Sequence, residues 1–112
     1  MQQSDAIEIL NETHRRCQSV FPCKIQDAYL YGSYARGDFD SESDVDILLT
    51  VDILPKELST YRKSIAAISS DLSLAYDVTV SIAVKPLEQF RRYADVLPYY
   101  KNVLREGIRC AG

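Results

Sequence analysis

The sequence predicts an α/β fold in which a small mixed β-sheet has helices packed on it. Short apolar runs at 26–31, 44–50 and 77–84 alternate with longer stretches of helical periodicity at 4–20 and 56–76. Strands that alternate with helices favour one layered domain over separate all-α and all-β parts.

The first helix is predicted at 4–20, where Ser4 is a candidate N-cap. Its apolar residues fall near one face: Ile7, Leu10, Cys17 and Val20. Pro22 ends this helix, because proline has no amide hydrogen and disfavours helix in the residue before it. The strand 26–31 follows, and a Gly-Ser turn at 32–33 ends it.

The middle of the chain predicts a helical turn at 34–36, a polar loop at 38–43 and the strand 44–50. In the helix 56–76 the buried stripe is predicted to hold Leu58, Tyr61, Ile65, Ile68 and Leu72. In the strand 77–84 alternation gives one apolar face: Val78, Val80, Ile82 and Val84. The opposite face of that strand is polar and is expected to look toward an active site.

Two prolines mark the last helices. Pro86 and Pro98 suit the first turn of a helix, where the missing amide hydrogen costs nothing. Gly107 is a candidate C-cap for the final helix.

Composition and charge narrow the function classes. With 112 residues, 46% of them apolar, the chain is expected to form a single domain spanning 1–112. A formal net charge of −3 argues against nonspecific electrostatic binding to the nucleic-acid backbone. No apolar run reaches the length of a membrane span, and no signal peptide is expected. The three cysteines lack CxxC spacing, which indicates reduced thiols in a cytoplasmic protein. The oligomeric state stays open.

The most informative segment is 32–49, GSYARGDFDSESDVDILL. Asp44 and Asp46 leave the same face of a strand, about 6–7 Å apart along the chain. Paired carboxylates pack poorly in a core but suit hard divalent cations, which prefer oxygen ligands. Gly32 and Ser33 offer amide groups and a hydroxyl to a phosphate, with no side chain at the glycine. The segment predicts a metal-assisted nucleotide site.

This pattern, G-S-x-x-x-G followed by S-D-x-D and an apolar strand, resembles the signature of the DNA polymerase β nucleotidyltransferase superfamily. Arg36, within Gly-Ser-Tyr-Ala-Arg-Gly, makes it similar to the minimal nucleotidyltransferases, the MntA-like antitoxins of HEPN/MNT systems. The resemblance extends over nearly the whole chain. It implies a polymerase-β-like nucleotidyltransferase fold.

The resemblance also implies roles for acidic residues. Asp44 and Asp46 would be catalytic metal ligands. The family pattern has a third carboxylate on the neighbouring strand, and Asp77 is the acid placed to supply it as a further catalytic metal ligand. The alternative for Asp77 is a turn residue between helix and strand, a position where aspartate is common.

Gly32 and Ser33 resemble the family's triphosphate clamp. Arg36 could contact phosphates or pair with an acid of the loop 38–42, since its guanidinium suits either partner. Ser43 is counted with the nucleotide-binding residues, and its hydroxyl is expected to cap the turn into the strand.

The resemblance implies a Mg²⁺-dependent nucleotidyltransferase, with two ions expected, that moves AMP from ATP onto an acceptor. The implied acceptor is a tyrosine of a partner HEPN-type toxin, which would make the chain an antitoxin. One alternative is a small-molecule acceptor with a separate helical subunit. Another is a non-catalytic partner that binds nucleotide or neutralises a toxin.

Overall fold

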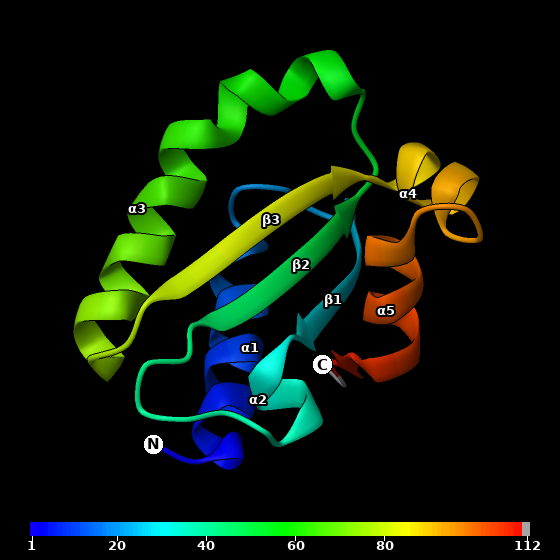
Figure 1. The fold of residues 1–112 in the computed structure, drawn as a ribbon. Coiled ribbons are helices and arrows are strands. Elements are labelled where there is room, and N and C mark those ends of the chain that lie inside the picture. Colours follow the sequence, from blue (N-terminus) through cyan, green and yellow to red (C-terminus); the bar gives the residue numbers. More distant parts are fainter. Residues whose placement is uncertain (111–112) are drawn as a thin grey trace.

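The computed structural model describes residues 1–110 of the chain. Its elements, in order, are the helix α1 (Gln3–Cys17), strand β1 (Ile25–Tyr31), helix α2 (Ser33–Arg36), strand β2 (Val45–Val51), 3₁₀ helix η1 (Pro55–Glu57), helix α3 (Leu58–Tyr76), strand β3 (Val80–Pro86), helices α4 (Leu87–Tyr93) and α5 (Pro98–Glu106), and strand β4 (Ile108–Arg109). The predicted α/β class is confirmed (Figure 1).

The strands form one mixed sheet in the order β3-β2-β1-β4. The pairs β1–β2 and β1–β4 are antiparallel, while β2–β3 is parallel. A parallel pair needs a long crossover, and α3 provides it. Figure 1 shows β3 at one edge of the sheet with α3 running beside it.

The two faces of the sheet have different cores. Alternate residues of β2 enter the larger core, which α1 and α3 complete: Val45, Ile47, Leu49 and Val51. The opposite face carries a smaller cluster with residues from α4 and α5: Tyr29, Leu48, Phe90, Tyr100 and Val103. By the period of two along a strand, Asp46 shares this second face with Leu48. The predicted acid therefore lies away from the larger core, at the beginning of β2.

The strand β3 begins three residues later than the predicted start at 77. Asp77 is instead the C-cap of α3 in the left-handed conformation, with φ 53° and ψ 47°, and its amide hydrogen bonds to the carbonyl of Ser73. The amide of Val78 bonds to the same carbonyl at 3.2 Å. The helix terminus thus uses the residues that the alternating pattern had assigned to the strand.

Other boundaries also differ from the prediction, by one to three residues. The helix predicted at 4–20 ends at Cys17, and the helix predicted from 56 begins as the 3₁₀ turn η1. Gly107 follows α5 as predicted, but with an extended backbone, and a Cβ there would lie 2.3 Å from the carbonyl oxygen of Val103. The short strand β4 was not predicted, because two residues give no readable period.

The backbone at Asp77 yields a test of this helix terminus. Asp77→Gly should raise the free energy of unfolding by about 0.5–1 kcal/mol, because glycine adopts a positive φ without a Cβ penalty. Thr79→Gly, two residues on, should lower the free energy of unfolding. Urea unfolding of both variants measures this. Destabilisation by Asp77→Gly would place Asp77 in an extended strand after all.

Candidate active site

Asp46 lies at the beginning of β2, half-buried, between the two neighbouring strands. Its register partners are Tyr31 on β1 and Ser81 on β3. Asp44 precedes the strand and is exposed. Burial raises the pKa of Asp46 above its ordinary value, and the nearby carboxylate of Asp44 raises it further, while Arg36 partly offsets both. The two acids are therefore close enough to repel each other, as paired metal ligands do before the metal binds.

Gly32 lies directly against the Asp46 carboxylate. A Cβ built on Gly32 would be 2.6 Å from Oδ2 of Asp46, and the glycine has a φ of 77°. Two independent constraints, the close approach and the backbone conformation, thus require glycine at this position. Ser33, the first residue of α2, follows Gly32 directly in the chain.

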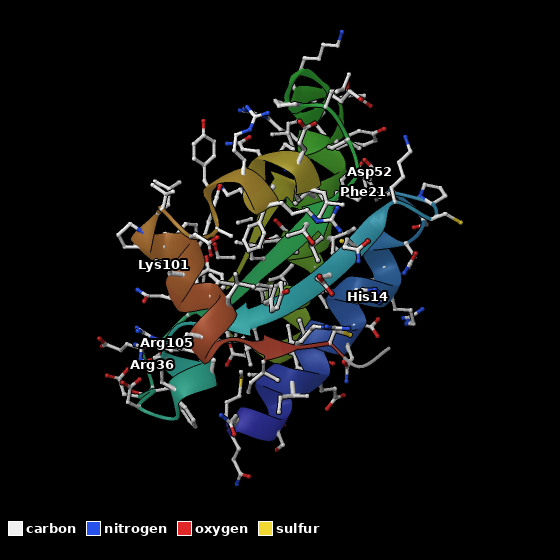
Figure 2. All side chains as sticks on the ribbon, turned by 90° about the vertical axis from the view of Figure 1, so that its right-hand side faces the viewer. His14, Phe21, Arg36, Asp52, Lys101 and Arg105 are labelled. Atoms are coloured by element: carbon white, nitrogen blue, oxygen red, sulfur yellow. The ribbon has the colours of Figure 1, made fainter. Side chains whose placement is uncertain are left out.

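Arg36 pairs with acids rather than extending freely into solvent. Its Nε lies 3.1 Å from Oδ2 of Asp38, and a terminal nitrogen lies 3.6 Å from Oε2 of Glu106 on α5. Arg105 also pairs with Glu106, and Figure 2 shows Arg36 and Arg105 at the same end of the molecule. Of the two predicted roles for Arg36, the structure contains the pairing with the following loop; contact with phosphate stays a prediction.

Ser43 organises the turn that leads into β2. Its Oγ accepts a hydrogen bond from the amide of Asp40 at 2.9 Å. Oδ1 of Asp40 in turn accepts the amide hydrogen of Glu42 at 2.9 Å. The predicted side-chain bonding at this turn is confirmed, and direct contact of Ser43 with nucleotide stays a prediction.

Asp77 does not join Asp44 and Asp46. Within residues 1–110, no three or more His, Cys, Asp or Glu side chains are grouped so that they could hold a metal ion. Asp77 instead lines a hollow of about 380 Å³ together with Met1 and Phe39. The predicted three-carboxylate set for two ions is therefore not assembled, because the left-handed cap of α3 places Asp77 outside the strand.

A pair of tyrosines borders the site and was not predicted as part of it. The hydroxyl of Tyr99 on α5 donates a hydrogen bond of 2.8 Å to the hydroxyl of Tyr31. Burial, followed by this hydrogen bond, raises the pKa of Tyr31 well above its ordinary value. Nζ of Lys85 lies 6.0 Å from the centre of the Tyr99 ring. The position of Tyr31 beside Asp46 comes from the register of β1 with β2, and no sequence pattern connects Tyr31 to Tyr99.

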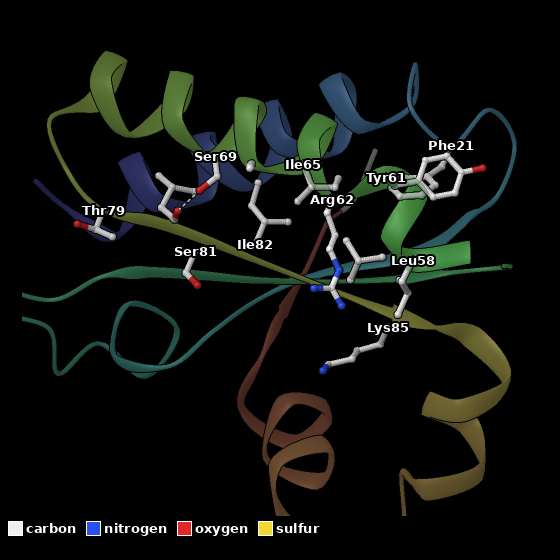
Figure 3. A pocket seen from close by; sticks show the side chains of 13 residues that line it. Phe21, Leu58, Tyr61, Arg62, Ile65, Ser69, Thr79, Ser81, Ile82 and Lys85 are labelled. Atoms are coloured by element: carbon white, nitrogen blue, oxygen red, sulfur yellow. Dashed lines mark hydrogen bonds between the residues drawn. The ribbon is translucent and has the colours of Figure 1, made fainter. Parts of the chain in front are cut away.

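A groove of about 610 Å³ lies between α3 and the edge strand β3. Thr79 and Ser81 line it, but neither Asp44 nor Asp46 does. Arg62 and Lys85 point toward the same part of the groove (Figure 3). The groove therefore lies beside the acidic pair, across β3, and does not enclose it.

None of the helices within residues 1–110 has the length and apolar character that a membrane crossing requires.

A Gly-Ser turn held against an Asp-x-Asp strand in a mixed sheet agrees with the nucleotidyltransferase fold that the sequence resemblance implies. The family model for the nucleotidyltransferase domain matches residues 10–110. The chain therefore belongs to the nucleotidyltransferase domain family, and it is a nucleotidyltransferase.

Similar proteins include a candidate protein adenylyltransferase of Methanocaldococcus jannaschii, which is 42% identical over 79 residues, covering 69% of this chain and 76% of the relative. A solved structure of a candidate nucleotidyltransferase from Sulfolobus solfataricus matches 96% of this chain and 80% of that chain, with a TM-score of 0.65 and 20% identity. A further solved structure is the complex of tri-AMPylated Shewanella oneidensis HEPN toxin with MNT antitoxin. One of its chains matches 96% of this chain and 72% of its own length, with a TM-score of 0.54 and 17% identity. The solved structures confirm the fold.

The contact at Gly32 predicts a selective loss of function. Gly32→Ala should displace the Asp46 carboxylate and reduce nucleotidyl transfer at least tenfold, because the new methyl group meets Oδ2. Gly37→Ala is the matched control, since Gly37 also has a positive φ, 88°, but open space around it. Both variants should lose about 1–2 kcal/mol of stability from the backbone strain. Equal transfer rates in the two folded variants would contradict the role of the contact.

The raised pKa of Asp46 predicts a pH-dependent gain in stability for Asp46→Asn. A raised pKa means that the folded protein favours the protonated carboxyl, so ionised Asp46 lowers stability at neutral pH. In the metal-free protein, Asp46→Asn should raise the free energy of unfolding at pH 7, and the gain should vanish below about pH 3, where both states are protonated.

Urea unfolding in EDTA at the two pH values measures the effect. Asp52→Asn serves as control, because Asp52 is exposed at the opposite end of β2. A loss of stability at pH 7 in Asp46→Asn would refute the expected repulsion.

Proposed function

We propose that the chain is a Mg²⁺-dependent nucleotidyltransferase that transfers AMP from ATP to a tyrosine of a HEPN-type partner protein, and so acts as an antitoxin. The contact between Gly32 and the Asp46 carboxylate carries this proposal, because it unites the predicted phosphate-binding turn with the acidic pair. The 42% identical relative, itself a candidate protein adenylyltransferase, supports a protein acceptor. The fold shared with a chain of the AMPylated HEPN toxin complex is consistent with the partner class.

The residues present fit one divalent ion. Asp44 and Asp46 offer carboxylate oxygens, one exposed and one half-buried, and their mutual repulsion would be relieved by a cation. Bound there, Mg²⁺ would neutralise negative charge on the triphosphate and on the leaving pyrophosphate.

The chain's own residues would position the nucleotide. Gly32 lets a phosphate approach the backbone, and Ser33 supplies a hydroxyl beside it. The amides of Ala35 and Arg36 bond to the carbonyl of Gly32, which leaves those of Ser33 and Tyr34 to donate to phosphate oxygens. Arg36 adds positive charge at the other end of α2, and Ser43 keeps the turn before Asp44 in place.

The proposed step conserves atoms and charge. The tyrosine oxygen of the partner attacks the α-phosphorus of ATP, and the bond between that phosphorus and the bridging oxygen to the β-phosphate breaks. Pyrophosphate leaves, the phenol proton passes to solvent, and the partner carries an AMP ester. The sheet and α2 would contribute alignment of the reacting atoms, which is the main requirement of phosphoryl-type transfer.

An apolar surface near the site supports a folded protein as acceptor. Exposed apolar residues gather on the segment before α5 and on α5 itself: Val96, Leu97, Tyr99 and Leu104. Tyr99 connects this surface to the site through its hydrogen bond to Tyr31. Exposed apolar side chains next to a reactive centre suit the docking of a protein surface.

A labelling experiment tests the proposed transfer. The chain is incubated with Mg²⁺, a purified HEPN partner and ATP labelled either at the α- or at the γ-phosphate. Label from α-labelled ATP alone should appear on the partner, and changing the modified tyrosine to phenylalanine should remove it. Asp44→Asn should abolish labelling, whereas Asp52→Asn should not. Transfer of γ-label would mean phosphorylation and overturn the proposal.

Nucleotide binding should depend on the metal. Without cations the ionised Asp44 and Asp46 face a negatively charged triphosphate, and repulsion between them opposes binding. Isothermal titration calorimetry with ATP should show binding in Mg²⁺ and at least tenfold weaker binding in EDTA. Equal affinity under both conditions would mean that the triphosphate binds away from the acidic pair.

A further inference from the structure

The position beside Asp46 on the neighbouring strand belongs to Ser81. The parallel register pairs Asp46 with Ser81 and Val45 with Val80, and the amide of Val45 donates to the carbonyl of Thr79 at 2.9 Å. Paired residues on adjacent strands project from the same face, and the strands lie about 4.8 Å apart. Ser81 is exposed, so its side chain is accessible on that face.

The register at this point is held by α3. The amide of Val80 donates to Oγ of Ser73 at 2.9 Å, and the carbonyl of Val80 accepts a hydrogen bond from Oγ of Ser69 (Figure 3). Both backbone groups of the residue before Ser81 are therefore bonded to the helix. A slip of β3 that moved another residue beside Asp46 would break these bonds.

Asp77 cannot take this place without refolding the end of α3. It lies four positions before Ser81, up to about 13 Å away along an extended chain. Its left-handed backbone and the bonds from Asp77 and Val78 to Ser73 hold it at the helix terminus. The register neighbours of Asp46 are thus a phenol, Tyr31, and a hydroxyl, Ser81.

We infer that this chain holds only a single metal ion with its own carboxylates, and that Ser81 occupies the place where a third carboxylate would complete a two-ion site. The inference rests on the proposed metal-dependent function and departs from the ligand set that the family resemblance implies. A neutral hydroxyl binds a hard cation far more weakly than a carboxylate, so the second ion lacks a third carboxylate among residues 1–110. Residue 81, not residue 77, then decides how many ions bind.

Metal stoichiometry tests the inference without measuring transfer. Binding of Mn²⁺ is followed by electron paramagnetic resonance in the presence of α,β-methylene-ATP, which cannot transfer AMP. The unaltered chain should bind one tight Mn²⁺ per nucleotide. Ser81→Asp should bind a second Mn²⁺. The affinity for this second ion should be at least tenfold higher in the variant than in the unaltered chain. Asp77→Asn should change neither number nor affinity beyond twofold.

The control is Ser70→Asp, which adds the same charge at an exposed position on α3. It should leave one tight ion. Two tight ions on the unaltered chain, with one lost in Asp77→Asn, would overturn the inference and leave the proposed function intact. The Asp77→Asn measurement holds even if Ser81→Asp fails to fold. Absence of any metal-nucleotide binding would overturn the proposed function itself, and the inference with it.

Discussion

The contact of the Asp46 carboxylate with the backbone of Gly32 is the constraint on which the site depends. It joins the end of β1 to the beginning of β2 at a point where any larger residue than glycine would collide. The contact keeps a half-buried acid close to a turn whose amides and hydroxyl suit phosphate. The cost is a carboxylate with a raised pKa, held near a second one. Functional sites commonly contain such locally unfavourable arrangements, which the surrounding fold stabilises.

Packing on both faces of the sheet offsets the free-energy cost of the half-buried Asp46 carboxylate. Val45 and Ile47 anchor β2 in the larger core on both sides of Asp46 in the sequence, and both are fully buried. On the other face Leu48 contacts the aromatic cluster of α4 and α5. The packing of Val45 and Ile47 thus adds to the contact with Gly32 in fixing the position of Asp46. A strand anchored in this way can present an acid at a fixed position without a salt bridge.

The sequence was sufficient for the class of fold, the order of the main elements and the glycine-serine and Asp44–Asp46 motif, because each depends on short-range periodicity or on a compact motif. The sequence was insufficient to place Asp77 at the end of a helix. The alternating pattern of β3 continues backward to residue 77, but the structure uses Asp77 as the C-cap of α3. Ser81 could not be recognised, because its meaning comes from the register with β2 and not from its neighbours in the chain. The pairing of Tyr31 with Tyr99 joins residues 68 positions apart and has no local signature.

The hydrogen bond between Tyr99 and Tyr31 ties the position of α5 to the strand that flanks Asp46. The helix α5 presents apolar side chains outward. Tyr99, in its first turn, hydrogen bonds to Tyr31, whose register partner is Asp46. Under the proposed function, a protein docked on the outer side of α5 would contact the helix that this hydrogen bond connects to the flank of Asp46. Docking and alignment of that protein would then be coupled through two hydroxyl groups, and a loosely docked acceptor would also be poorly aligned.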